Sequence, residues 1–169
     1  RRDQKGDCYV NWSRLRSAWE RGLVAPDLPD GYLTDAIVRL GAGGDPSAVP
    51  FWVWIKLLDG VKGWSGYTAE WRSLPVHWNR LFMASVATPD QKREAEALDW
   101  RVYASSLSEA DDRAYEAQGV KVCPSHSVSL ACVACRQCDG TEKGANRPSF
   151  YIPLHGAIGA KRRREVDNG

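Results

Sequence analysis

Short apolar runs rich in β-branched residues alternate with helical segments along most of this chain. Each strand-plus-helix unit spans fewer than about 30 residues, which is typical of a parallel sheet with right-handed crossovers. The pattern predicts an α/β fold with a mostly parallel sheet of about five strands and flanking helices, either an open sheet or a partial (β/α) barrel. The predicted strands are residues 36–40, 65–69, 81–87, 101–105 and 120–123; the predicted helices are 12–21, 49–61, 90–98 and 108–118, with a short helix or turn at 74–80.

Polar residues at the ends of these runs predict helix caps and turns. Thr88, Ser105 and Ser108 are expected to cap helices, because their side-chain oxygens can accept hydrogen bonds from a first helical turn. A glycine-rich stretch leads to Asp45, which is placed either in a tight turn or as the N-cap of a helix with Pro46 at its first position. The stretch lacks the Lys-Ser/Thr of a P-loop and the third glycine of a dinucleotide fingerprint, so no nucleotide site is predicted.

Composition limits the class of protein. The 169 residues predict a single α/β domain over residues 1–169. No apolar run approaches the roughly 20 residues that cross a bilayer, so no membrane association is expected. Eight Trp, six Tyr and three Phe exclude a disordered chain, and most of the Trp are expected in the core. Trp52 and Trp54 lie two apart and cannot share one helix face, so one of them is expected to be exposed.

Four of the five cysteines are crowded into one short segment. Cys123, Cys132, Cys135 and Cys138 lie too close in sequence to offer several disulfides of normal geometry, whereas their thiolates can converge on a shared cation. We therefore predict that these four residues bind one metal centre, in a cysteine-rich metal-binding segment at residues 120–140. Cys8 lies apart from them and is predicted not to be required for this centre.

Two metals compete for the predicted centre. Structural zinc is typically held by two Cys-x2-Cys pairs with a longer loop between them. The uninterrupted run Cys132-x2-Cys135-x2-Cys138 instead resembles the bacterial ferredoxin motif, in which a loop holds three corners of an iron-sulfur cubane. The spacing favours a [4Fe-4S] cluster, with zinc as the alternative and buried or redox-active thiols as a third reading. His126, inside the same segment, is predicted to hydrogen-bond a sulfur rather than to replace a thiolate.

The predicted sheet places this segment in space. Ligands gather at the carboxyl ends of parallel strands, and Cys123 is the last residue of the last predicted strand. The metal-binding loop is therefore expected at the mouth of the sheet, together with the polar residues that follow the other strands. The plainer alternative is that a metal merely pins a C-terminal loop and that the polar residues cap helices.

Both ends of the chain are basic. Arg1, Arg2 and the run Lys161–Arg164 are predicted to be solvated, the run within a basic tail at residues 157–169. Adjacent cations attract phosphate, but the net charge of +2 is too small to imply nucleic-acid binding by itself. Nucleic acid is therefore a partner that the sequence does not favour.

Several tracts occur in a fixed order along nearly the whole chain: CYVN at residues 8–11, VRLGAGGDPSAVP at 38–50, GYTAEW at 66–71, MASV at 83–86, the cysteine run and LHG at 154–156. Together they resemble an uncharacterised family of bacteriophage and prophage proteins. The resemblance implies a viral origin and supports a bound metal, but it implies no known reaction. Members of that family usually carry a further Cys-x-x-Cys shortly before the CYVN tract, and such a pair would offer Cys8 partners in a second centre.

The sequence thus predicts a phage-encoded iron-sulfur protein with a redox or unassigned enzymatic role, and it leaves open whether the chain is an enzyme. We expect an electron-transfer partner and a location in the host cytoplasm or on the virion. The alternative is a zinc-stabilised module that binds nucleic acid or acts in the virion or on the host. No substrate, catalytic residue or oligomeric state is predicted.

Overall fold

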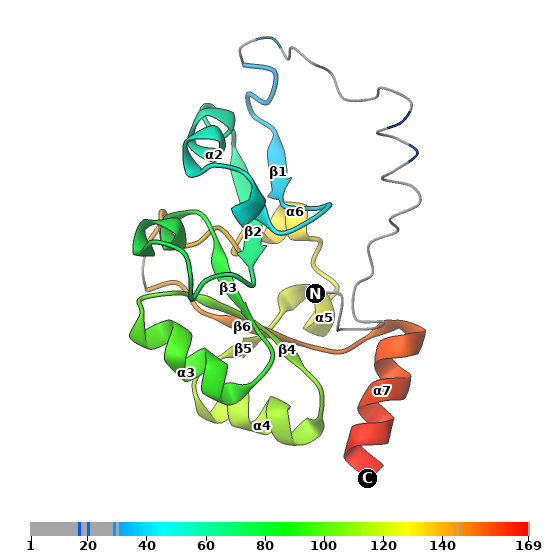
Figure 1. Ribbon diagram of the computed structural model, residues 1–169. Coiled ribbons are helices and arrows are strands. Elements are labelled where there is room, and N and C mark those ends of the chain that lie inside the picture. Colours follow the sequence, from blue (N-terminus) through cyan, green and yellow to red (C-terminus); the bar gives the residue numbers. More distant parts are fainter. Residues whose placement is uncertain (1–16, 18–19, 21–28, 30, 145, 169) are drawn as a thin grey trace.

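Six parallel strands form one open sheet in the order β1-β2-β3-β4-β6-β5 (Figure 1). A computed structural model describes residues 17, 20, 29, 31–144 and 146–168. The predicted α/β class and parallel sheet are confirmed, and the sheet is open rather than a partial barrel. Cys8 and the helix predicted at 12–21 lie outside the described residues, apart from Ser17 and Glu20. The strands are β1 (Ile37–Leu40), β2 (Gly63–Thr68), β3 (Met83–Val86), β4 (Val102–Ser106), β5 (Lys121–Val122) and β6 (Phe150–Pro153).

One strand was not predicted from the sequence. β6 lies between β4 and β5, so the expectation that residues 120–123 form the last strand is wrong. Its four residues end in Pro153, and a proline argues against a central strand because it cannot donate to the ladder. The proline costs no hydrogen bond to β4, because the donor on that side is Leu154, whose N–H bonds Ser106 O at 2.9 Å, and β5 pairs with β6 only as far as Tyr151.

The helices that connect the strands begin largely where the caps predict. Thr88 Oγ1 accepts a hydrogen bond from Gln91 N at 3.2 Å, and Ser108 Oγ accepts one from Asp111 N at 3.0 Å. The cap predicted at Ser105 is wrong, because that residue lies within β4. The helices are η1 (Pro46–Ala48), α2 (Phe51–Leu57), η2 (Val76–Arg80), α3 (Pro89–Ala97), α4 (Glu109–Ala117), α5 (Pro124–Ser127), α6 (Cys132–Cys135) and α7 (Gly156–Asn168).

One face of the sheet forms the hydrophobic core. Side chains alternate along a strand, so residues that are register partners share a face. Val86 on β3, Ala104 on β4 and Tyr151 on β6 are such partners, and all three are buried. This face packs against residues of the connecting helices α2, α3 and α4. The core side chains of these helices are Phe51, Trp54, Leu57, Ala95 and Tyr115.

The opposite face of the sheet is more polar. Ser85 on β3 pairs in register with Tyr103 on β4, and both are partly exposed. Ser65 and Tyr67 share one face of β2, and Tyr67 pairs in register with Met83, two residues before Ser85. This second face is the one against which the cysteine segment lies, as the cavity described below shows.

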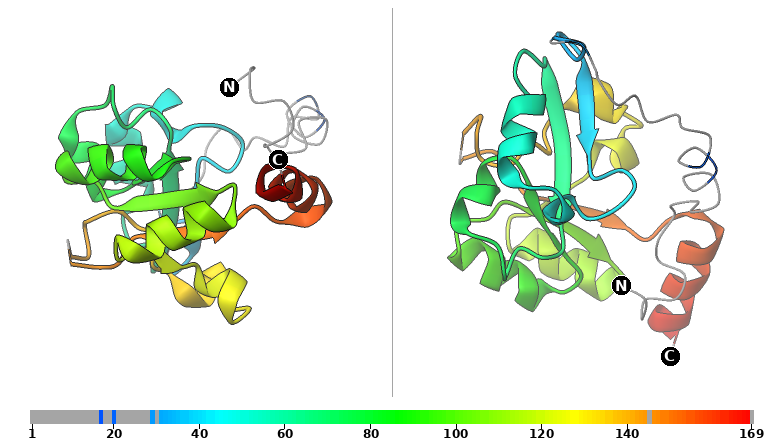
Figure 2. Two further views of the ribbon diagram at one scale, coloured as in Figure 1. Left: turned by 90° about the horizontal axis from the view of Figure 1, so that it is seen from below. Right: turned by 45° about the horizontal axis from the view of Figure 1, so that its top comes forward.

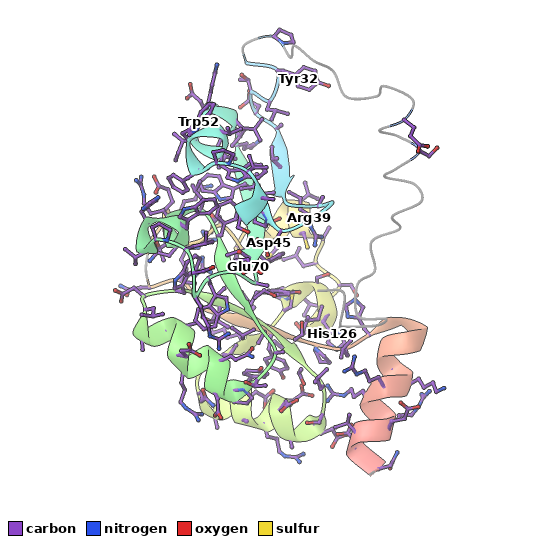
Figure 3. The ribbon with its side chains drawn as sticks, viewed as in Figure 1. Tyr32, Arg39, Asp45, Trp52, Glu70 and His126 are labelled. Carbon is purple, nitrogen blue, oxygen red and sulfur yellow. The ribbon has the colours of Figure 1, made fainter. Side chains whose placement is uncertain are left out.

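The tryptophans follow the prediction. Trp64, Trp71, Trp78 and Trp100 are buried in the core. Of the two that cannot share a helix face, Trp54 packs against the core, whereas Trp52 is 69% exposed on α2 (Figure 3).

The basic tail is a helix rather than a solvated end. Figure 2 shows α7 at the periphery of the molecule. Arg163 is only 16% exposed; its guanidinium donates to both carboxylate oxygens of Asp112 and to Ser106 Oγ at 3.1 Å. These contacts tie α7 to α4, so the prediction of a solvated run is wrong for Arg163. Gly156 and Gly159 lower the intrinsic helix propensity of this segment, which explains why its sequence did not predict a helix.

Candidate metal centre

The four predicted ligand residues line one cavity. Cys123, predicted as the last residue of a strand, directly follows β5 and is 7% exposed. Cys132 and Cys135 are the first and last residues of α6, and Cys138 follows three residues later. The cavity has an empty volume of about 360 Å³, including the part that opens to solvent. None of the four thiols forms a disulfide, and the other residues lining the cavity include Ser65, Tyr67, Pro124, Gln137 and Phe150.

The thiols interact electrostatically but are not tightly grouped. The pKa of Cys138 is raised to about 12, chiefly by burial; a hydrogen bond from Tyr67 opposes the rise, and the neighbouring Cys123 and Cys135 contribute to it. Burial also raises the pKa of Cys135, with Cys123 and Cys132 adding to the effect. Within the described ranges, no three His, Cys, Asp or Glu residues lie close enough together to hold a single metal ion. Metal binding here would displace protons from Cys135 and Cys138.

Two tyrosine hydroxyls point at the sulfurs from the second face of the sheet. The Tyr67 hydroxyl donates to the sulfur of Cys138, and the Tyr103 hydroxyl is hydrogen-bonded to Cys123. Their rings are neighbours, with centroids 4.4 Å apart. Burial, followed by the nearby sulfurs, raises the pKa of both phenols above the ordinary value, so both remain proton donors at neutral pH.

The backbone also donates to the sulfurs. The N–H of Gln137 bonds the sulfur of Cys135, which lowers the pKa of that thiol. Arg136, with φ 50° and ψ 38°, ends α6 in the left-handed conformation and turns the chain toward Cys138. The carbonyl of Cys138 then accepts a hydrogen bond from Gly66 N at 2.9 Å, which joins the loop to β2.

A buried arginine holds the other side of the cysteine loop. Arg101, which directly precedes β4, is 4% exposed, and it donates to Gln137 O at 2.7 Å and to Pro148 O at 2.7 Å. It also bonds Gly140 O and lies 3.3 Å from the carboxylate of Asp139, which is completely buried. Burial lowers the pKa of Arg101, and Arg147 lowers it further, while Asp139 opposes both.

Arg147 holds the same loop, and we call Arg101 and Arg147 the clamp. It pairs with Asp139 and donates to Arg136 O at 2.8 Å. Neither Arg101 nor Arg147 was predicted from the sequence, because neither belongs to a spaced motif. The one available signal was Asp139, an acidic residue placed directly after the last cysteine, where a cationic partner was to be expected.

The histidines are not part of the cavity lining. His126 is exposed on α5 (Figure 3), and its ring centroid lies 6.4 Å from that of His155. The structure therefore does not bring His126 to a sulfur, contrary to the prediction. His77 packs edge-on against Phe51, with 4.6 Å between the ring centroids.

The glycine-rich stretch builds a turn, as one of its two readings predicted. Gly41 has φ +70°, and a Cβ atom there would meet Gly44 O at 2.8 Å. Asp45 caps η1 by accepting from Ser47 N at 3.0 Å, so the second reading also holds. Its carboxylate further accepts from Thr68 Oγ1 and Ala69 N, both at 2.8 Å, and so joins this turn to the end of β2.

Comparisons with known proteins found no match to the chain: no protein-family model, no curated protein and no solved structure matches it. In the described part of the chain, no helix combines the length and apolarity needed to span a membrane. The cysteine-lined cavity is therefore the feature of the molecule that bears on its function.

Proposed function

We propose that this chain is a phage-encoded iron-sulfur protein that holds a [4Fe-4S] cluster on Cys123, Cys132, Cys135 and Cys138. The observation that carries the proposal is that all four sulfur side chains line one cavity, although Cys123 comes from the end of a strand and the other three from a separate loop. The phage origin and the host-cytoplasm location rest on the sequence resemblance alone.

The cavity fits a cluster of this kind in three respects. Hydrogen bonds from Tyr67 and from Gln137 N–H already reach the sulfurs of Cys138 and Cys135, and such donors stabilise thiolates bound to metal. Thiolates on a cubane each bind a different iron, so they lie farther apart than four thiolates on one ion. The guanidinium groups of the clamp offset the negative charge that a tetrathiolate centre carries.

Zinc is the alternative occupant. A single zinc ion would draw all four sulfurs to within about 2.3 Å of one point. The four sulfurs would have to approach one another to reach that geometry. The short run from Cys132 to Cys138 leaves little chain for such a movement. With zinc, the centre would only stabilise the fold.

A bound cluster supplies reversible one-electron transfer, which favours a redox role with a protein partner. The protein's own residues hold the sulfurs, donate hydrogen bonds to them, and shield Cys123 and Cys138 from water. We propose no catalytic step for these residues.

Metal analysis of anaerobically purified protein tests the proposal. We expect brown protein that contains about four iron and about four acid-labile sulfide per chain, as in a cubane, and that bleaches with dithionite. Each of the four Cys→Ser variants should lose most of this iron, while Cys8→Ser, the matched control, should retain it. Colourless protein with one zinc per chain after reconstitution would refute the proposed cluster, and loss of iron in Cys8→Ser would add Cys8 to the ligand set.

A further inference from the structure

The cysteine segment presents an apolar patch to solvent. Val128, Leu130 and Val133 are 72%, 39% and 56% exposed, and Cys132, next to Val133, is exposed as well. α5 packs against α6, and Leu130 N bonds Pro124 O at 3.2 Å, so these side chains belong to one small lobe. Clustered apolar side chains on a soluble surface commonly mark an interaction site. We call Val128, Leu130 and Val133 the apolar patch.

Positive charge lies around the same cysteine cavity, since Arg136 lines it and Lys121 pairs in register with Phe150, another lining residue. Between Lys121 and Gln137 the chain contains no Asp or Glu, whereas it contains Lys121 and Arg136. Lys143 lies beside Arg136. A Cβ atom added to Gly63 would lie 3.3 Å from Arg136 Cδ and 3.7 Å from Lys143 Nζ, so both side chains reach the same point. Asp139, which is fully buried, lies 3.8 Å from Lys143 Nζ, but it is shared with Arg101 and Arg147, so these four groups together carry a net positive charge. We call Lys121, Arg136 and Lys143 the basic rim.

We propose that the apolar patch and the basic rim dock an acidic one-electron carrier protein, with Cys132 as the ligand nearest to it. This inference rests on the proposed iron-sulfur function and names its partner. One electron passes from the reduced carrier to the protein's centre; no bond forms or breaks, and no proton is transferred. Charge complementarity argues for this occupant, since a basic rim attracts an acidic surface and speeds encounter.

The apolar patch favours a protein over nucleic acid. A phosphate backbone would pair with the basic rim but would leave Val128 and Val133 against charged oxygens and sugars. A protein interface combines an apolar centre with a charged rim, which is the arrangement described here.

The test uses reduced flavodoxin as the acidic carrier and the complete protein. Binding is measured by titration, and reduction of the protein by stopped-flow absorbance. Val128→Glu and Lys121→Glu should each weaken binding and slow reduction about fivefold or more at low ionic strength, and the difference should shrink as salt is added. Val76→Glu and Lys56→Glu are the matched controls, because Val76 is 58% exposed on η2 and Lys56 is exposed on α2; both should behave as wild type.

Dithionite separates the two levels of the proposal. It should reduce all variants at the wild-type rate, because it needs no docking surface. A protein that holds iron and reacts with dithionite, but whose reaction with flavodoxin ignores Val128→Glu, overturns the docking surface alone. A protein without iron overturns the proposed function and the electron step with it. A stable dimer that buries the patch, or DNA binding that Val128→Glu abolishes, also overturns the inference.

Discussion

Arg147 and Cys135 are joined through opposite ends of one peptide unit. Arg147 donates to the carbonyl of Arg136 at 2.8 Å, while the N–H of the same peptide, belonging to Gln137, bonds the sulfur of Cys135. A donor on the carbonyl both fixes the orientation of the peptide and polarises its N–H. The clamp that holds the cysteine loop therefore also aims a hydrogen bond at a predicted ligand.

Replacing Arg147 with Met tests this relationship. The variant frees the 136–137 peptide and removes a charged partner from buried Asp139, so we expect a loss of about 1–3 kcal/mol in the free energy of unfolding. Iron per chain should fall as well. Urea denaturation and iron analysis are the measurements. Arg80→Met is the matched control, because Arg80 forms an exposed pair with Glu142 in the same loop and should cost less than about 1 kcal/mol. Equal effects of the two variants would argue against a clamp.

The hydroxyl of Tyr67 is expected to tune the centre. Its hydrogen bond to Cys138 favours the more negatively charged, reduced form of a cluster, so Tyr67→Phe should shift the midpoint potential to more negative values. Voltammetry of the anaerobic protein measures this shift. Tyr32→Phe, at a residue 63% exposed, should leave the potential unchanged. An unchanged potential in Tyr67→Phe, with cluster content preserved, would show that the hydroxyl does not act on the centre.

Local signals explain what the sequence could predict. The strand-helix alternation, the caps at Thr88 and Ser108, and the place of Cys123 at a strand end all depend on neighbouring residues, and the structure agrees with each. The crowding of four cysteines into 16 residues was likewise a local signal, and all four line one cavity.

Long-range contacts explain what the sequence could not predict. β6 joins the sheet through pairing with β4, which lies 47 residues earlier in the chain; β6 has only four residues, fewer than the about 5–6 of a usual strand, and it ends in a proline. Arg101 reaches the cysteine loop 36 to 47 residues later. α7 depends on a contact with α4 rather than on helix propensity. Each of these features is fixed by a partner that periodicity cannot identify.

Arg163 should stabilise the fold more than Lys161 and Arg164, the exposed residues of the same basic run. Its guanidinium pairs with Asp112 and bonds Ser106, whereas Lys161 is 75% exposed. Arg163→Met leaves Asp112 and the buried Ser106 hydroxyl with fewer partners, so we expect about 1–3 kcal/mol of destabilisation. Arg164→Met, at an exposed residue of the same helix, should change the free energy of unfolding by no more than about 0.5 kcal/mol. Thermal unfolding of the two variants decides between a docked helix and a solvated end.

Asp45 is expected to stabilise the fold without affecting the metal centre. Oδ1 accepts from Ser47 N and Thr68 Oγ1, and Oδ2 accepts from Ala69 N, so the two oxygens serve different partners. Asp45→Asn keeps one acceptor oxygen but puts an NH₂ group where the other oxygen was, so one of these hydrogen bonds must be lost, at a cost of about 1–3 kcal/mol.

Asp45→Ala removes all three hydrogen bonds and leaves the hydroxyl of Thr68, a completely buried residue, without its carboxylate acceptor. Its loss in the free energy of unfolding should therefore exceed that of Asp45→Asn, as measured by urea denaturation. Asp59→Asn, at an exposed residue, is the matched control and should unfold like wild type. Iron per chain should stay at the wild-type value in all three variants, because Asp45 does not line the cysteine cavity. A loss of iron in Asp45→Asn would show that the turn after β1 supports the centre as well as the fold.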